Sequence, residues 1–146
     1  MMEGACLCGA VRFEVSLPAL YCGHCHCSMC RRAHGAAYVT WVGVAKRDLR
    51  VLEGAGLLAE YQSSDKGRRS FCSSCGSQLF CDISTEPDTI DVVLTAIDND
   101  SLPARSLPEP QAHVFFDCRA GWTVTPDDGL PRLGGADGLQ PLDDET

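Results

Sequence analysis

Residues 22–30 read CGHCHCSMC, so four cysteines and two histidines occupy nine consecutive positions. Thiolates and imidazoles are the preferred protein ligands of zinc. Such a loop belongs to a disulfide framework, to a closed structural metal site, or to a metal site with one position open for chemistry. The arrangement of the other cysteines decides between these three alternatives.

A disulfide framework is the least favoured alternative. The chain has 146 residues, enough for one domain with its own hydrophobic core, so ten cysteines are not needed to hold it together. Cysteine makes up about 7% of the chain, below the roughly 8–10% of small secreted disulfide scaffolds. The start, MMEGACLCGAVRFEV, lacks a signal-peptide pattern, and no run of about 18 apolar residues predicts a membrane span. We therefore expect a cytoplasmic protein with reduced, metal-binding cysteines and no membrane partner.

The end of the chain is more acidic than the rest of the sequence. The formal net charge of −8 argues against a nucleic-acid partner, because nucleic-acid binders usually carry a basic surface. From Thr125 onward six acidic residues accompany one arginine, which gives this segment a net charge of −5. The segment is rich in Gly, Pro and Asp. We predict a folded domain over residues 1–124 and a loosely packed acidic tail over residues 125–146.

Short apolar runs predict an all-β domain. From Val11 to Leu17 apolar and polar residues alternate, as in a half-buried strand. Further strand candidates lie at residues 36–44, 57–61, 89–97 and 113–116, and turn-forming clusters separate them at residues 53–56, 63–67, 84–88 and 101–110. Only residues 29–35 predict a helix, which Gly35 ends. We expect a sandwich or partly closed sheet with metal sites on its loops.

Two cysteine pairs predict a closed metal site. Cys72 and Cys75 form a C-x2-C pair followed by glycine, which is the knuckle of a zinc ribbon. Cys6 and Cys8 form a C-x-C pair that is also followed by glycine, and a disulfide within so short a loop is strained. Four thiolates from two chelating pairs fill a tetrahedral zinc site, so we predict a structural zinc here.

The cysteine-rich loop predicts a second, open metal site. Cys25, Cys27 and Cys30 supply three sulfurs, and no matching pair remains elsewhere to supply the fourth. Three protein ligands and one open position are typical of catalytic zinc. The alternative is a closed site with a fourth ligand taken from His24, His26, Cys22 or His113. The remaining cysteines, Cys22, Cys81 and Cys118, are expected to be ordinary buried thiols.

Three thiolates give a zinc site a formal charge of −1, so the ion is a weaker Lewis acid than one held by neutral histidines. Such a zinc suits a substrate thiol, which it can deprotonate for nucleophilic attack. Arg31 and Arg32 directly follow Cys30 and are candidates for binding a substrate carboxylate, or else are solvated surface residues. A second basic cluster of equally ambiguous meaning consists of Lys66, Arg68 and Arg69.

Four segments resemble one known family. GACLCGAVRFE, CHCSMCRRAHGA, YQSS followed by RRSFCSSCGSQLF, and HVFFDCRAGW are similar to motifs of the glutathione-dependent formaldehyde-activating enzyme family, which includes the centromere protein V domain. The resemblance runs from about Gly4 to Trp122 and includes seven cysteines in matching arrangements.

This resemblance implies a fold, two zinc ions and an activity. The family fold is an arrangement of small antiparallel sheets often called a β-tent. The family's structural zinc would be held by Cys6, Cys8, Cys72 and Cys75, and its catalytic zinc by Cys25, Cys27 and Cys30. The named family member condenses formaldehyde with glutathione to S-(hydroxymethyl)glutathione, as a carbon–sulfur lyase run in the synthetic direction. The substrate thiol of this chain and its oligomeric state stay open.

Two rival functions follow from the same residues. One is a non-catalytic zinc module that binds a protein partner, since one fold can host both roles. The other is a methionine sulfoxide reductase, suggested by a related fold, with Cys118 as nucleophile and Cys81 or Cys22 as the resolving thiol. His113 and Trp122 are expected in the core, with pocket lining as the alternative. Asp98 is either a turn former or a group that supports a site.

Overall fold

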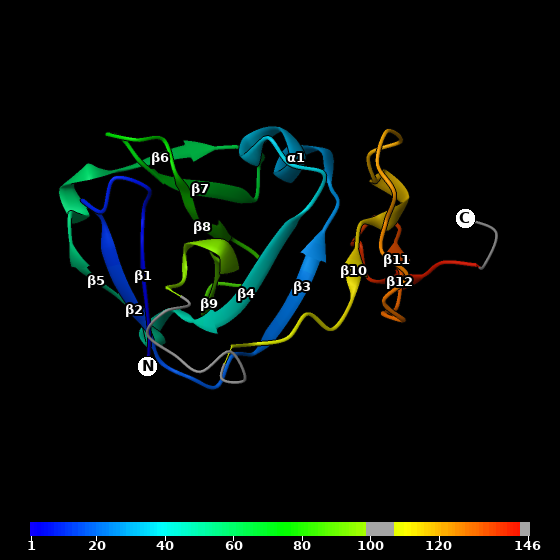
Figure 1. Cartoon of the computed structure of the whole chain (residues 1–146), viewed down its shortest axis with the longest axis horizontal. Helices are drawn as coiled ribbons and strands as arrows, with labels where there is room; N and C mark the ends of the chain where they lie inside the picture. Colours follow the sequence, from blue (N-terminus) through cyan, green and yellow to red (C-terminus); the bar gives the residue numbers. More distant parts are fainter. Residues whose placement is uncertain (99–106, 144–146) are drawn as a thin grey trace. The chain divides into compact units, whose positions relative to one another are not determined.

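The computed structural model describes residues 1–98 and 107–143 (Figure 1). Its contacts divide the chain into two compact units. The first unit consists of Met1–Tyr21 and Val42–Pro108, and the second consists of Cys22–Trp41 and Glu109–Thr146. Strands dominate, with a single α-helix among the described residues, so the predicted all-β class is confirmed.

The first unit contains two runs of neighbouring strands. One sheet has the order β1–β2–β5 and pairs its strands antiparallel. In the other run the order is β9–β8–β7–β6, again antiparallel, with part of β4 next to β9. The bounds are β1 Met2–Ala5, β2 Arg12–Val15, β4 Val39–Ala45, β5 Leu49–Glu53, β6 Leu58–Gln62, β7 Gly67–Cys72, β8 Gln78–Ile83 and β9 Thr89–Val93. Short 3-10 turns connect β4 to β5 at Lys46–Asp48 and β5 to β6 at Ala55–Leu57, and another follows β9 at Leu94–Ala96.

The alternating sequence around β2 builds the core of the first unit. Val11, Phe13 and Val15 are fully buried, as the alternation predicts. The ring of Phe13 meets the ring of Phe80 edge to face, with the centroids 5.1 Å apart. The strand is shorter than the apolar pattern, because Leu17 lies beyond its end and is 41% exposed.

The second unit is built around the cysteine-rich loop. β3 (Tyr21–Cys25), which belongs to this unit from Cys22 onward, leads to the helix α1 (Ser28–His34), and β10 (His113–Val114) pairs parallel with β3. A 3-10 turn at Phe116–Cys118 and the strands β11 (Leu133–Gly134) and β12 (Gln140–Pro141) follow. Gly35 ends the helix in the left-handed conformation with φ 60°, as predicted. The parallel β3–β10 pair departs from the antiparallel sheets that the family resemblance implied.

The predicted strands are present with different bounds, and seven of the described strands were not predicted. The run at residues 113–116 is a strand only at His113–Val114, because Phe115 has a left-handed φ of 50°. The turn cluster at residues 101–110 lies mostly outside the described residues. The strands missed are β1, β3, β5, β7, β8, β11 and β12. These strands are short or carry charged and cysteine residues, which hides the apolar pattern on which the prediction depends.

Residues 125–143 of the acidic segment form turns and a short strand pair, where the sequence predicts a loosely packed tail. β11 and β12 pair antiparallel, with Leu133 opposite Pro141. Aspartate side chains fix the turns by accepting backbone hydrogen bonds: Asp128 accepts from Leu130 at 3.0 Å, and Asp137 accepts from Leu139 at 2.9 Å. Polar turns therefore order this segment where the chain has few apolar residues. Residues 144–146 lie outside the described part.

The described residues contain no helix with the length and apolar character needed to cross a membrane.

Candidate metal centres

A cluster of four thiols lies on two hairpin turns of the first unit. Cys6 and Cys8 lie in the turn after β1, Cys72 ends β7, and Cys75 lies in the turn before β8. The four Sγ atoms all lie within 4.8 Å of one another. The Sγ atoms of Cys6 and Cys8 are 3.5 Å apart, and those of Cys8 and Cys72 are 3.9 Å apart. Sulfurs on one tetrahedral zinc are about 3.8 Å apart, so this four-thiol cluster has the geometry to hold a metal ion.

A glycine shapes each of the two turns. Gly9 and Gly76, which follow the two cysteine pairs, adopt left-handed φ angles of 76° and 78°. Gly9 donates its N–H to the carbonyl of Cys6 at 3.0 Å, and Gly76 donates to the carbonyl of Cys72 at 2.7 Å. These bonds fold each turn back so that both cysteines of a pair face the same point.

Hydrogen bonds distribute negative charge unevenly over the four-thiol cluster. The Ser77 hydroxyl accepts the backbone N–H of Leu7 at 2.9 Å, which leaves its own hydrogen for the Sγ of Cys75 at 3.2 Å. This bond is the main cause that lowers the pKa of Cys75 to about 5. For Cys8 a bond from the Ala10 backbone lowers the pKa, but the neighbouring thiols outweigh it and raise the pKa to about 11. Cys75 is therefore the favoured thiolate when no metal is present.

The second cluster, with three thiols, lies where β3 runs into α1. The Sγ atoms of Cys25, Cys27 and Cys30 all lie within 4.8 Å of one another. Cys27 caps the helix, because its sulfur accepts the N–H of Cys30 at 3.3 Å. The sulfur of Cys30 accepts the indole N–H of Trp41 at 3.4 Å. Interactions with the other two thiols, followed by burial, raise the pKa of Cys25.

No described histidine, cysteine or acidic residue of the second unit adds a ligand atom within 4.8 Å of all three sulfurs. The alternatives for a fourth ligand, Cys22, His24, His26 and His113, all belong to this unit, and none joins the cluster. The three-thiol cluster therefore resembles the metal sites that keep a position for an exogenous ligand.

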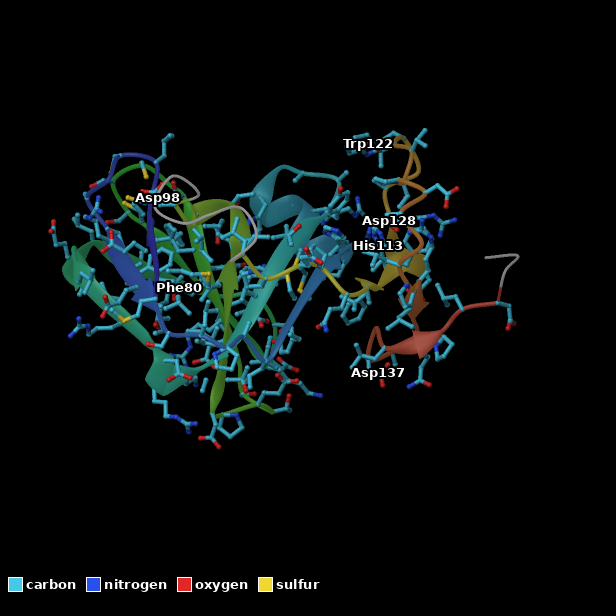
Figure 2. All side chains as sticks on the ribbon, turned by 60° about the horizontal axis from the view of Figure 1, so that its bottom comes forward. Phe80, Asp98, His113, Trp122, Asp128 and Asp137 are labelled. Carbon is cyan, nitrogen blue, oxygen red and sulfur yellow. The ribbon has the colours of Figure 1, made fainter. Side chains whose placement is uncertain are left out.

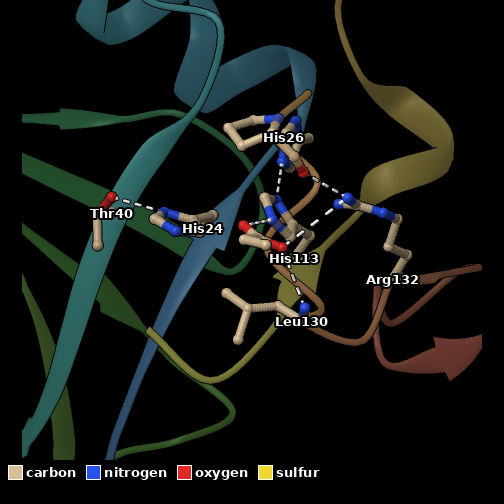
Figure 3. A network of polar contacts seen from close by, with 8 residues as sticks. His24, His26, Thr40, His113, Leu130 and Arg132 are labelled. Atoms are coloured by element: carbon tan, nitrogen blue, oxygen red, sulfur yellow. Dashed lines mark hydrogen bonds and ion pairs between the residues drawn. The ribbon is translucent and has the colours of Figure 1, made fainter. Parts of the chain in front are cut away.

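The histidines form a cluster of their own in the second unit. Ligand atoms of His24, His113 and Asp128 lie within 4.8 Å of one another, so this cluster also has the groups to hold a metal ion. His113 Nε2 lies 2.8 Å from Asp128 Oδ2, and His113 Nδ1 lies 2.8 Å from His26 Nε2 (Figure 3). The sequence did not reveal Asp128, because nothing in an acidic, proline-rich segment distinguishes one aspartate from its neighbours.

Arg31 and Arg32, which directly follow Cys30 in the sequence, lie in different environments. Arg31 donates from Nε to the carbonyl of His26 at 3.2 Å and from NH2 to the carbonyl of Cys118 at 3.1 Å. Arg31 thus ties two segments of backbone together. Arg32 is exposed on the helix.

The second basic cluster does not form one surface. Arg68 is exposed and pairs with Glu60 at 3.2 Å. Arg69, the next residue of β7, is buried and donates to the Ser63 hydroxyl at 3.1 Å. Neighbouring residues of a strand point to opposite faces, which separates the two guanidinium groups.

Several single-residue expectations are also settled. His113 is fully buried as expected, whereas Trp122 is 75% exposed and lies away from His113, so its expected core position is wrong (Figure 2). Cys22 and Cys81 are buried as expected, but Cys118 is exposed. Asp98 is exposed and donates its backbone N–H to the Glu3 carbonyl at 2.7 Å.

Comparisons with known proteins agree with these motifs. The family model described as glutathione-dependent formaldehyde-activating enzyme matches residues 1–118. A Halomonas elongata protein that carries the name of such an enzyme is 33% identical over 128 residues, which are 84% of this chain and 79% of that protein. A Schizosaccharomyces pombe protein named as an uncharacterized lyase is 32% identical over 80 residues, which are 53% of this chain and 55% of that protein.

A solved structure is also similar to this chain. A crystal structure of a Rhodobacter sphaeroides protein matches with a TM-score of 0.60 and 32% sequence identity, covering 75% of this chain and 97% of that one. The family model covers all seven cysteines of the two clusters. The chain therefore belongs to the glutathione-dependent formaldehyde-activating enzyme family.

Proposed function

We propose that the protein is a zinc-dependent enzyme of the carbon–sulfur lyase type, which activates a small glutathione-like thiol for adduct formation with formaldehyde or a related aldehyde. The observation that carries this proposal is the three-thiol cluster, whose sulfurs converge without a fourth ligand from the described part of their own unit. Membership of the family supports the thiol and the aldehyde as substrates.

The two clusters have different proposed roles. Cys6, Cys8, Cys72 and Cys75 would hold a structural zinc, since four sulfurs complete its coordination. Cys25, Cys27 and Cys30 would hold a catalytic zinc. When bound there, zinc would supply the Lewis acidity that lowers the pKa of a substrate thiol.

The reaction conserves all atoms and electrons. The substrate sulfur forms a bond to the aldehyde carbon, the electron pair of the carbonyl π bond moves to the oxygen, and the thiol proton ends on that oxygen. No oxidant or reductant is consumed. This addition is already easy in water, so the main contribution of the protein is to hold the thiol in its reactive form next to the aldehyde.

The chain's own groups prepare the proposed catalytic cluster. The indole N–H of Trp41 and the backbone N–H of Cys30 each point at a sulfur, at 3.4 and 3.3 Å. Hydrogen bonds to sulfur stabilise its charged form. The cluster is mostly buried, with Cys25 7% and Cys30 4% exposed, so water competes little for these bonds.

Zinc content and thiol binding test the proposal together. We would measure zinc by elemental analysis in the wild-type protein, in Cys27→Ser and in the control Cys118→Ser, which replaces an exposed cysteine outside both clusters. Each protein would then be titrated with glutathione under reducing conditions. We expect two zinc ions in the wild type and the control, about one in Cys27→Ser, and loss of glutathione binding only in Cys27→Ser.

Two other results of these measurements would contradict the proposal or a part of it. One zinc ion in all three proteins, with no thiol bound, would contradict the catalytic cluster and favour a non-catalytic zinc module that binds a protein partner. Two zinc ions with no affinity for glutathione would leave the metal sites in place and reject glutathione as the thiol. The cytoplasmic location stays a prediction from the sequence.

A further inference from the structure

A row of three side chains leads to the loop that carries the three-thiol cluster (Figure 3). Asp128 Oδ2 lies 2.8 Å from His113 Nε2, and His113 Nδ1 lies 2.8 Å from His26 Nε2. Both imidazoles are fully buried, whereas the Asp128 side chain is 27% exposed. His26 is the residue between Cys25 and Cys27, so the row ends inside the cysteine motif.

Asp128 determines where the hydrogens of this row lie. An ionised carboxylate only accepts hydrogen bonds, and the bond from His113 is the main cause that lowers the pKa of Asp128 to about 2. His113 Nε2 must therefore carry the hydrogen. A neutral His113 then accepts at Nδ1, so His26 donates from Nε2. His26 Nδ1 is left unprotonated, and no group among the described residues forms a hydrogen bond with it.

The same row fixes the position of the loop. The backbone N–H of His26 donates to the carbonyl of Val114 at 3.0 Å, and its carbonyl accepts from Arg31 at 3.2 Å. Its ring lies between other rings, with centroid distances of 4.9 Å to Tyr38 and 5.2 Å to Phe116. A rotated His26 ring would lose its bond to His113, and close packing of a buried residue opposes such a rotation.

Asp128 is itself held in place. Its second oxygen, Oδ1, accepts the N–H of Leu130 at 3.0 Å and lies 3.9 Å from the guanidinium of Arg132. One carboxylate oxygen of Asp128 thus accepts a hydrogen bond within its own turn, and the other accepts the hydrogen bond from His113. The segment that the sequence describes only as an acidic tail supplies a specific, oriented acceptor.

We propose that Asp128 is a positioning residue for the three-thiol cluster: by accepting the Nε2–H of His113 it fixes the tautomers of His113 and His26, and so holds Cys25 and Cys27 in the geometry that binds a metal ion. The inference rests on the proposed function in one respect, namely that this cluster binds a metal. Groups that orient a metal site without touching the metal change its affinity by about 10- to 100-fold when they are removed.

The test uses the full chain with Asp128→Ala and Asp128→Asn, and Asp127→Asn as the control for loss of one negative charge at the neighbouring position. Zinc affinity would be measured by competition with a chelator, and the step that belongs to the three-thiol cluster is the one absent from Cys27→Ser. Long-range 1H–15N NMR of the imidazoles would give the tautomers of His26 and His113. Zinc at the four-thiol cluster reports whether the first unit of each variant is folded, and the dispersion of the NMR signals reports on the second unit.

We expect Asp128→Ala to weaken zinc binding at the three-thiol cluster by about 10- to 100-fold, with the four-thiol cluster and Asp127→Asn unchanged. His26 should be the Nε2–H tautomer in the wild type and a mixture in Asp128→Ala. Asp128→Asn should show a smaller loss, because an amide keeps one of the two acceptor oxygens. Unchanged affinity and an unchanged tautomer in Asp128→Ala would overturn the proposal.

Failure of the proposed function gives a different result. If wild-type protein binds no zinc at the three-thiol cluster, the metal part of both proposals is wrong. The tautomers then decide what remains: a mixture in Asp128→Ala supports the control of His26 by Asp128, and an unchanged tautomer refutes it as well.

Discussion

The indole Nε1–H of Trp41 lies 3.4 Å from the sulfur of Cys30 and donates to it. Trp41 comes from β4 and Cys30 from α1, so the bond joins two elements of the second unit. Both residues are buried, with 6% and 4% of their surface exposed. A buried donor aimed at a sulfur helps to orient that sulfur toward its cluster, as groups around a metal site do for the ligands.

Replacing Trp41 by Phe should weaken metal binding at the three-thiol cluster. The substitution keeps an aromatic ring but removes the N–H, and a hydrogen bond to a charged group contributes about 1.5–3 kcal/mol. The expected loss of zinc affinity is therefore about 10- to 100-fold, measured by competition with a chelator. Trp122→Phe is the matched control, because Trp122 is 75% exposed. Equal affinities for the two variants would show that the indole N–H has no effect on the metal.

In metal-free protein, Cys75 should react with iodoacetamide faster than Cys8. The thiolate is the nucleophile, and the pKa is about 5 for Cys75 and about 11 for Cys8. Neutral pH therefore leaves Cys75 mostly ionised and Cys8 mostly protonated. We expect a rate difference of at least about 10-fold, followed by mass spectrometry of the alkylated peptides.

Ser77→Ala tests the cause of that difference. Removing the hydroxyl takes away the main group that lowers the pKa of Cys75. Alkylation of Cys75 at neutral pH should become slower, while that of Cys118, an exposed thiol outside the cluster, stays the same. A rate for Cys75 that does not change in Ser77→Ala would mean that another group ionises this thiol.

Asp128 should stay ionised at a pH where ordinary aspartates are protonated. Its pKa is lowered from 3.8 to about 2, chiefly by the bond from His113. A lowered carboxyl pKa stabilises the folded state at every pH above the unfolded value of 3.8, and this contribution is lost as the pH falls from there through about 2. At pH 3 the 13C signal of the Asp128 carboxyl should be that of a carboxylate in the wild type. A protonated carboxyl at pH 3 would contradict the His113 bond.

Gly43→Ala should destabilise the first unit. A Cβ at Gly43 would overlap the ring of Tyr21, whose hydroxyl donates to Asp91. Forcing extra atoms into a packed site costs about 1–3 kcal/mol, so the free energy of unfolding in urea should fall by that amount. Gly56→Ala is the control, since a Cβ there meets no atom within 4 Å. A loss no larger than that of the control would show that Tyr21 moves aside freely.

Local spacing in the sequence was sufficient to predict both thiol clusters. The C-x-C and C-x2-C pairs lie on single turns, and Gly9 and Gly76 adopt the left-handed conformations that such turns require. Tetrahedral zinc chemistry then leaves few ways to combine two such pairs. The strand at β2 could be predicted because its signal is also local. Side chains of a strand alternate between its two faces, and apolar and polar residues alternate from Val11 to Val15.

The sequence could not predict the partners that long-range packing brings together. His26 and His113 are 87 positions apart and meet because β10 pairs with β3, a strand that the cysteine-rich sequence concealed. Asp128 looked like one solvated aspartate among several, and its bond to His113 depends on turns made by polar groups rather than on an apolar pattern. Metal-ligand spacing is encoded within a few residues and is readable from sequence, whereas hydrogen-bond partners distant along the chain are decided only when the tertiary structure forms.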